Sequence, residues 1–173
     1  MSLAELFLSD SCTYLRETYP GRLERALEVL PPADLWWRPH FDCISFGTIL
    51  THLEGNVRQW ILSGLGGESD RRERELEFSA TTGPDGTDLM QRLRSTAEAA
   101  SDVIAVLDEV QLARPITIQG FQTTVLAAVM HVVEHFSWHT GQAVWIAKMR
   151  AGAGHEMAFF DEDAVNSARN AGE

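Results

Sequence analysis

Cysteine and basic residues are scarce in this chain, and each scarcity excludes a class of protein. Cys12 and Cys43 are the only cysteines among the 173 residues, and they lie in no Cys-x-x-Cys motif. Two isolated cysteines are too few for a disulfide framework, so we interpret each as a small buried residue. Lys and Arg number 14 against 25 Asp and Glu, which gives a net charge of −11. We therefore expect no nucleic-acid partner and no binding to an anionic lipid surface.

Long hydrophobic runs are also missing. No apolar stretch reaches roughly 18 residues, so the sequence predicts no membrane span. The N-terminus carries no basic segment followed by an apolar core, so we expect no signal peptide and a cytoplasmic location. Hydrophobic residues make up 45% and charged residues 23%, which is the balance of an ordinary globular domain with one core.

Apolar periodicity predicts an all-α fold. Apolar residues recur at three- and four-residue steps, and no strand-like alternation is sustained. The simplest architecture is a four-helix bundle in residues 1–155, followed by a C-terminal tail in residues 156–173. The first predicted helix is Leu3–Leu30, with a break at Tyr19-Pro20-Gly21. The second is capped by Asp42 or Ser45 and ends near Leu65, and the third is capped by Thr87 and runs to about Leu107. The fourth is capped by Thr123 or Thr124 and ends near Arg150.

The connections between these helices differ in character. Residues 34–43 form a loop, and Pro115–Ile118 suggests a short extended turn. Residues 66–86 form a long, highly charged connection, in which basic and acidic side chains alternate. This alternation favours a self-compensating surface ion network over the alternative, a site for an anionic substrate. The residues concerned are Arg71, Arg72 and Arg74 with Asp70, Glu73, Glu75 and Glu77.

The five tryptophans fall into three predicted environments. Trp36 and Trp37, in the first loop, are expected to cover one end of the bundle. Trp60 lies on the apolar row of the second predicted helix, so we assign it to the core. Trp138 and Trp145 occupy positions suited to the surface or to a dimer contact.

A row of histidines at four-residue steps is the most informative pattern in the chain. His131, His135 and His139 make up half of its 6 histidines. Residues four apart on a helix lie nearly above one another, so two such imidazoles can bind one metal ion. His135 and His139 fall within the apolar face of the last predicted helix, whereas His131 lies about 40° further round. We predict an inward pair, with His131 as a flanking residue.

His52, on the second predicted helix, can complete a metal site from across the bundle. Three neutral imidazoles leave open positions on a metal, which is typical of a catalytic site. Asn56, one turn after His52, and Gln142, one turn after His139, are candidates to orient a bound water; each could instead bond a neighbouring helix. The alternative for the histidines is a packed or solvated role without metal.

Other titratable residues are given no role in this site. Glu54 and Glu134 project away from the histidine face, so we assign neither as a general base. His40 and His155 are interpreted as surface residues. The metal is left open, because three imidazoles accept zinc, nickel, copper, cobalt or iron.

These motifs together resemble the DinB-like superfamily of four-helix metalloproteins. The segment His135-Phe-Ser-Trp-His139-Thr-Gly-Gln142 is similar to its His-x-x-x-His-x-Gly-Gln signature. The Trp37-Arg-Pro39 loop and the helix around Ile49–Asn56 resemble its second landmark, and Asp70–Phe78 is similar to one uncharacterised branch. The resemblance covers about residues 3–150 and implies the DinB-like four-helix bundle.

The resemblance also implies a ligand set and a chemistry. His52, His135 and His139 match the positions that hold a divalent metal, commonly zinc or nickel, in that superfamily. Its characterised members include transferases that use low-molecular-weight thiols, and many pair as homodimers. Many carry Arg after the last ligand, where this chain has Thr140, which puts the binding of an anionic thiol in doubt. We expect a metal-dependent enzyme acting on a small molecule, a thiol S-transferase or else a hydrolase or isomerase; a non-catalytic metal-binding or dimerising bundle is the rival.

Overall fold

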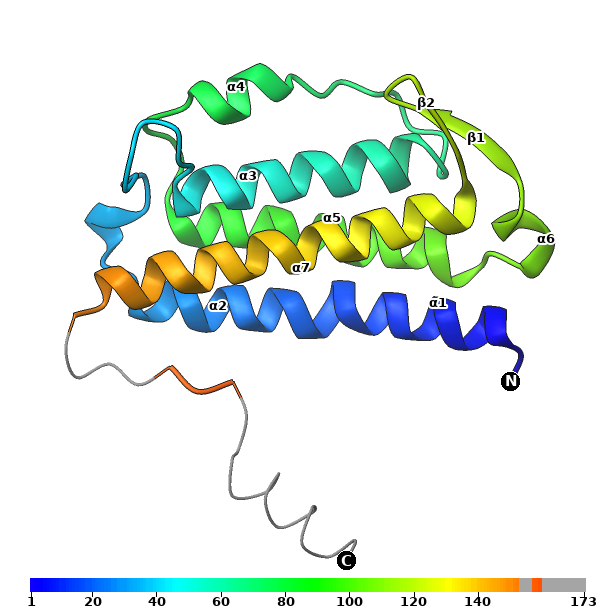
Figure 1. The fold of residues 1–173 in the computed structure, drawn as a ribbon, viewed down its shortest axis with the longest axis horizontal. Helices are drawn as coiled ribbons and strands as arrows, with labels where there is room; N and C mark the ends of the chain where they lie inside the picture. The colour runs from blue at the N-terminus through cyan, green and yellow to red at the C-terminus, as the bar shows by residue number, and fades with distance from the viewer. Residues whose placement is uncertain (153–156, 160–173) are drawn as a thin grey trace, which may run out of the picture.

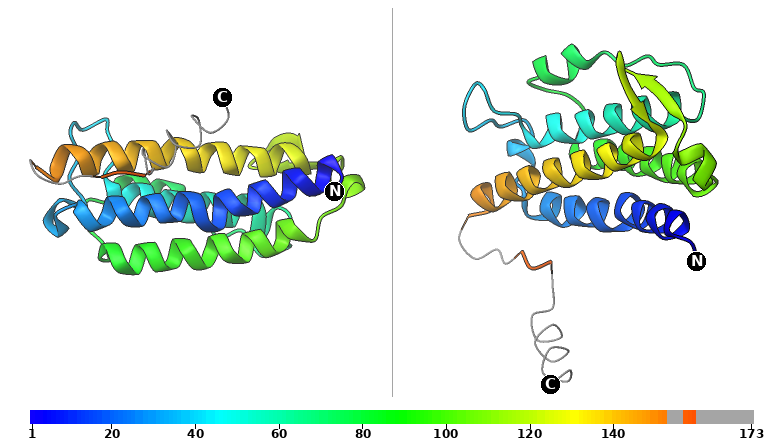
Figure 2. Two further views of the ribbon diagram at one scale, coloured as in Figure 1. Left: turned by 90° about the horizontal axis from the view of Figure 1, so that it is seen from below. Right: turned by 45° about the vertical axis from the view of Figure 1, so that its right-hand side comes forward.

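The chain forms four long helical segments that lie side by side around one core (Figure 1). The computed structural model describes residues 1–152 and 157–159. Two further views show the same segments running alongside one another (Figure 2), so the predicted all-α four-helix bundle is confirmed. The segments are α1 (Leu3–Thr13) continuing through the π turn η1 (Tyr14–Thr18) into α2 (Tyr19–Val29), α3 (Phe46–Val57) continuing into the π turn η3 (Arg58–Ser63), α5 (Gly86–Ala105) and α7 (Val125–Arg150).

Large apolar side chains from all four segments fill the core. Leu15, Leu23, Ile49, Leu93 and Phe136 are fully buried, each from the apolar face of its helix. Burying one such side chain stabilises the fold by about 1.5–3 kcal/mol. Helix α2 packs along α7, and α3 packs along both α5 and α7. The core therefore holds α3 and α7 next to each other, as a site shared between them requires.

The connection between α3 and α5 returns along the length of the bundle. Figure 1 shows α3 and α5 running in the same direction, so the chain between them must cross back. This crossover, residues 64–85, contains the six-residue helix α4 (Arg74–Ser79), which packs on α3. The sequence predicts only a charged connection here. The structure adds a helix, and it places the segment over α3.

The segment before α7 is a β-hairpin rather than an extended turn alone. Strand β1 (Pro115–Ile118) pairs antiparallel with β2 (Phe121–Thr124), from Pro115 opposite Thr124 to Ile118 opposite Phe121. Gln119 and Gly120 form the turn with φ values of 54° and 80°, the left-handed pair that twists a tight hairpin correctly. Two short helical turns complete the described elements, η2 (Pro32–Asp34) and α6 (Glu109–Leu112).

Side-chain caps define where three helices begin. Ser45 accepts a hydrogen bond from the Thr48 N–H, and Thr124 accepts one from the Ala127 N–H, so both predicted caps are confirmed. The predicted cap Thr87 is wrong. Asp85 caps α5 by accepting from the Asp88 N–H, and the helix begins at Gly86.

The predicted break at Pro20 does not occur, because a π turn directly before the proline allows the helix to continue through it. The Tyr19 N–H bonds to the Tyr14 carbonyl, one residue further back than in an α-helix. Pro20 has no N–H to give to the Arg16 carbonyl, which accepts a hydrogen bond from Arg94 Nη1 at 3.3 Å. The wider turn and this bond from α5 let the helix continue to Val29.

The first loop covers one end of the bundle, as predicted. Trp36 and Trp37 pack against the core. A Cβ at Gly47 would lie 2.9 Å from Trp36 Cε2, so glycine there makes room for the indole. Arg150, at the end of α7, pairs with Asp34 at 2.9 Å and lies over the Trp37 ring at 4.6 Å. These contacts fix the last turn of α7.

The two cysteines are half-buried and free, so the predicted full burial is only partly correct. Cys12 Sγ donates to the Ser101 carbonyl at 3.5 Å. Burial raises the pKa of the Cys12 thiol, which lowers its reactivity at neutral pH. Cys12 packs against the core as a small side chain.

The predicted tail falls mostly outside the described residues, and so does His155. Within the described part, Met157 packs against the core and Arg25 donates to the Ala158 carbonyl at 2.7 Å. Among the described residues, no helix combines the length and apolarity that crossing a membrane requires.

Candidate metal centre

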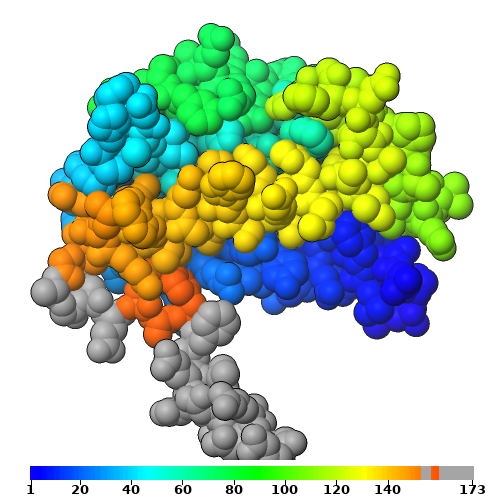
Figure 3. Space-filling model, viewed as in Figure 1, coloured from blue at the N-terminus to red at the C-terminus, as the bar shows by residue number. Residues whose placement is uncertain are grey.

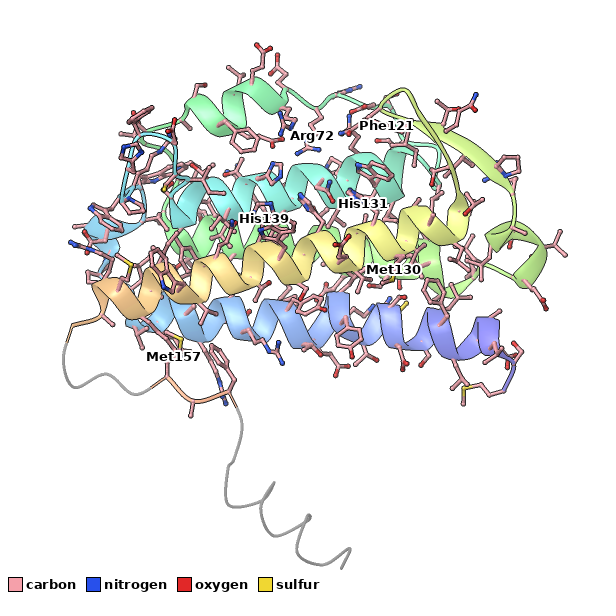
Figure 4. The ribbon with its side chains drawn as sticks, viewed as in Figure 1. Arg72, Phe121, Met130, His131, His139 and Met157 are labelled. Carbon is pink, nitrogen blue, oxygen red and sulfur yellow. The ribbon has the colours of Figure 1, made fainter. Side chains whose placement is uncertain are left out.

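Three histidines from two helices converge between α3 and α7. His52 lies on α3, and His135 and His139 lie one turn apart on α7. Ring nitrogens of all three lie within 4.8 Å of one another, and the Nε2 atoms of His52 and His135 are 3.2 Å apart. Figure 4 shows His139 between α3 and α7, with Arg72 between α3 and the crossover. The structure thus brings together the three residues selected from the sequence.

Burial favours the neutral form of two of these imidazoles, His135 and His139. His52 is only 4% exposed, and His135 and His139 are half-buried. Burial and, to a smaller extent, the nearby charges of His139, His52, His131 and Arg72 lower the pKa of His135 from 6.5 to about 3. Burial lowers the pKa of His139 to about 4, and the charge of His52 makes a smaller contribution in the same direction. Neutral imidazole is the form that binds a metal, and His135 and His139 have this form at neutral pH.

A buried ion pair from the crossover supports His52. Glu77 Oε2 lies 2.8 Å from His52 Nδ1, and Arg72 binds the same carboxylate through Nε at 2.7 Å and Nη2 at 2.8 Å. The side chains of Arg72 and Glu77 are 5% and 8% exposed. The predicted surface network is therefore wrong for this pair, because the crossover presses both side chains against α3.

Hydrogen bonds determine which nitrogen of two histidines faces the cluster. Burial raises the pKa of Glu77, but hydrogen bonds from Arg72 and His52 outweigh it and hold this pKa below the ordinary value. Glu77 is thus a carboxylate, and at 2.8 Å it is nearer to His52 Nδ1 than the donor Arg72 Nη2, which lies 3.1 Å away. We therefore assign the proton of His52 to Nδ1, which leaves the lone pair on Nε2. His139 Nδ1 likewise donates to Gln142 Oε1 at 2.7 Å. Both Nε2 atoms are left free for a ligand.

Gly55 allows the ion pair to approach α3 closely. A Cβ at this position would lie 2.9 Å from Arg72 Nε and closer still to Glu77 Oε1. Any larger residue must displace the carboxylate that holds His52. Gly55 lies in the middle of a helix, where glycine is unfavourable by roughly 0.5–1 kcal/mol relative to alanine. The close approach of Glu77 explains its presence.

The cluster fits a divalent metal ion. Two imidazole nitrogens that bind one zinc ion at 2.0–2.1 Å with tetrahedral angles lie roughly 3.3 Å apart. The observed Nε2–Nε2 distance of 3.2 Å agrees with this value. A direct hydrogen bond between the two rings would instead need a proton on the Nε2 of one of them. In either arrangement the buried Nδ1 of His135 has no hydrogen-bond partner among the described residues.

Comparison with known proteins identifies the family. Residues 2–158 match the family model described as "Protein of unknown function (DUF1572)", which covers most of the chain. The chain belongs to the DUF1572 family. No match was found among curated proteins.

The DUF1572 fold is also found in a solved structure. A crystal structure of a DinB-like protein, YjoA, from Bacillus subtilis matches with a TM-score of 0.62 and 20% sequence identity. The match covers 87% of this chain and 96% of the YjoA chain. At this identity it shows the fold alone, so the predicted DinB-like bundle is confirmed and the chemistry must be argued from the site.

Two further candidates lie beside the cluster in this DUF1572 protein. The His131 ring lies 4.1 Å from the ring of Trp60 and 5.4 Å from that of His135, so it flanks the cluster as predicted. Burial lowers the pKa of His131. Asn56 is buried, and its Oδ1 has no partner among the described residues. Together with His52 they line a cavity of about 370 Å³.

The remaining candidates lie apart from the cluster. Glu134 is exposed and Glu54 is half-buried, and neither joins the three histidines, as predicted. The His40 side chain is exposed, which agrees with its surface assignment. Sequence reasoning missed Arg72 and Glu77 as members of the site. The one signal for them was Gly55 in mid-helix, which marks a close approach without naming the partner.

Proposed function

We propose that this DUF1572 protein is a divalent-metal-dependent enzyme that acts on a small molecule. His52, His135 and His139 are the metal ligands. One observation carries the proposal: three imidazole nitrogens lie within 4.8 Å of one another, and two of the rings have their other nitrogen held by a side-chain oxygen. Such support from a second layer of hydrogen bonds is typical of metal ligands.

An open coordination position favours catalysis over a structural role. Structural zinc sites are closed by four protein ligands, whereas three histidines leave room for a small molecule. The cavity of about 370 Å³ beside His52 and His135 gives that molecule access. Zinc or nickel bound here would lower the pKa of a coordinated thiol or water. The histidines hold the ion, and Glu77 and Gln142 hold the histidines.

Thiol transfer to an electrophile is the proposed reaction. The site combines three imidazole nitrogens, which suit zinc or nickel, with an apolar wall from Trp60, and these metals accept a thiolate in an open position. Metal-assisted hydrolysis is the second candidate, because Thr140 is a buried hydroxyl at the position where an arginine could have held an anionic thiol.

Elemental analysis followed by a thiol-consumption assay tests the proposal. We expect the purified protein to contain zinc or nickel. The loaded enzyme should consume N-acetylcysteine in the presence of electrophiles such as 1-chloro-2,4-dinitrobenzene, and His135→Ala should not. If the rate of thiol consumption does not rise above the rate without enzyme, but the protein hydrolyses an ester in a metal-dependent way, the result would favour metal-assisted hydrolysis. A well-folded protein that takes up no divalent metal would contradict both.

A further inference from the structure

The cavity beside the histidine cluster extends from the metal ligands toward the β-hairpin. It is lined by His52 and His135 at one end and by Arg74 and Phe121 elsewhere. Figure 4 shows Phe121 and His131 on the hairpin side of the cluster. In the space-filling view the surface of α3 is visible between the crossover and hairpin on one side and α7 on the other (Figure 3). A molecule bound at the histidines can therefore extend along this cavity.

The charge of this cavity is opposite to that of the protein. The chain carries a net charge of −11, yet the cavity lining contains two arginines and no Asp or Glu. Four other cavities on the described part of the chain each include at least one Asp or Glu. An anion is thus favoured at this cavity over the others.

Arg74 is the arginine that can bind a ligand. Arg72 is neutralised by its bidentate pair with Glu77. Arg74 forms no ion pair with any described residue, and its guanidinium lies 4.6 Å from the centre of the Phe78 ring. A guanidinium with free N–H groups binds a carboxylate through two parallel hydrogen bonds.

Two buried polar atoms in the lining have no hydrogen-bond partner in the described part of the chain. Asn56 is 4% exposed and Trp60 is 7% exposed, and neither Asn56 Oδ1 nor Trp60 Nε1 has a hydrogen-bond partner among the described residues. An unsatisfied buried polar group is unfavourable, so these atoms indicate a bound group that satisfies them. The Trp60 N–H requires an acceptor, and Asn56 Oδ1 requires a donor such as an N–H.

Aromatic rings give the cavity flat walls. The ring centroids of Trp60 and His131 lie 4.1 Å apart. Phe121 lies on β2 and is 63% exposed. Such rings stack on planar ligand groups at little entropic cost. The flat walls favour a planar ligand over a branched aliphatic one.

We infer that this cavity binds a small carboxylate that carries an N–H group and a planar aromatic group, of the kind found in aromatic N-acyl amino acids. Arg74 pairs with the carboxylate, Trp60 donates to an acceptor on the ligand, and Asn56 accepts from its N–H. The inference rests on the proposed function in that the histidines form the reacting end of the same cavity. It names the class of substrate.

Binding of hippurate, an aromatic N-acyl glycine, tests the inference by calorimetry on the purified protein. Hippuramide, in which a neutral amide replaces the carboxylate of hippurate, is the matched control ligand. We expect hippurate to bind roughly tenfold or more tightly than hippuramide, and Arg74→Gln to remove that preference. The control Arg71→Gln, an exposed arginine of the same segment outside the cavity, should bind hippurate within about twofold of the wild type.

Asn56→Leu provides a second, independent variant. It removes an unsatisfied buried acceptor, so it should raise the Tm of the free protein by roughly 2–4 °C while weakening hippurate binding. A residue with only a structural role would not combine higher stability with lower affinity.

The outcomes separate this inference from the proposed function. Equal binding of hippurate and hippuramide overturns the inference, and metal content still decides the proposed function. Unchanged hippurate binding in Arg74→Gln with complete loss in His135→Ala also overturns it, because the carboxylate then binds the metal directly. Arg74-dependent binding supports the inference, even in a protein found to contain no metal.

Discussion

Glu77 fixes the orientation of His52 through one carboxylate oxygen. The Nδ1–Oε2 distance is 2.8 Å, and Arg72 holds the same carboxylate with two further hydrogen bonds. A metal ligand anchored in this way loses little conformational entropy on binding, and the carboxylate raises its basicity. The contribution of Glu77 to metal affinity is therefore separable from that of the ligands themselves.

Glu77→Gln should weaken metal affinity without removing a ligand. The amide loses the charge that holds His52 and Arg72, and loss of such a partner lowers affinity by roughly 10- to 100-fold. Competition with a chelator measures this change. Glu75→Gln, at an exposed position of the same helix, is the control. Equal affinities of the two variants would contradict the assigned role of Glu77.

The stability of the metal-free protein should fall as the pH falls below about 6.5. The folded-state pKa of His135 is about 3 and that of His139 is about 4, both below the unfolded value of 6.5. Between these values the unfolded chain binds protons that the folded protein excludes, so the free energy of unfolding rises with pH. We expect a loss of roughly 1–3 kcal/mol between pH 7 and 4.5, after allowance for solvent screening.

Urea denaturation with chelator at several pH values measures this loss. The variant His135→Gln cannot titrate at this position and should show a smaller decline. A wild-type protein with the same pH profile as the variant would show that burial of the imidazole does not lower its pKa.

At the scale of secondary-structure elements, the crossover must lie directly against α3 for the site to form. Gly55→Ala places a methyl group where the Arg72–Glu77 pair lies. We expect it to lower the free energy of unfolding by roughly 1–3 kcal/mol and to weaken metal binding.

Gly141→Ala is the matched control for Gly55→Ala. A Cβ at Gly141, in α7, meets no atom within 4 Å. Alanine there should leave metal binding unchanged and stabilise the helix by roughly 0.5–1 kcal/mol. Similar effects of the two substitutions on metal affinity would contradict the close contact between the crossover and α3.

The histidine cluster could be predicted from the sequence because it follows helix geometry. His135 and His139 share one face of α7 whatever packs against it, and His52 lies beside the apolar row of α3. The same periodicity predicted the four long helices, and residue type offered Thr123 or Thr124 as the cap of α7, of which Thr124 is the one observed. These features depend on local spacing alone.

The supporting pair could not be predicted, because its burial depends on where the crossover runs. Arg72 and Glu77 lie among alternating charges that are typical of a solvated surface. Only the parallel direction of α3 and α5 brings this segment back over His52. The Pro20 break was mispredicted for a related reason, since Arg94 on α5 supplies the bond that the proline cannot.

At the scale of the whole molecule, an apolar face of α1 and α7 is a surface on which we propose that two copies pair. Trp138 is 65% exposed, Met130 is 52% exposed and Tyr14 is 43% exposed. Together with Phe7, these three side chains line one surface cavity. Exposed apolar clusters of this kind mark protein interfaces.

Light scattering coupled to gel filtration tests this pairing. We expect a mass about twice the 19.3 kDa of one chain. Trp138→Glu should shift the mass to that of one chain, because it places a charge in the interface. Val110→Glu changes an exposed apolar residue of α6 and should leave the mass unchanged. A wild-type mass of one chain would contradict the pairing.

The metal content of His135→Ala, compared with the wild type, tests the three-histidine site most directly. The wild type should hold about one divalent ion per chain, coordinated by His52, His135 and His139. The variant removes one ligand and should hold none after dialysis, while circular dichroism shows the same helix content. Stoichiometric metal in the folded variant would contradict the ligand assignment.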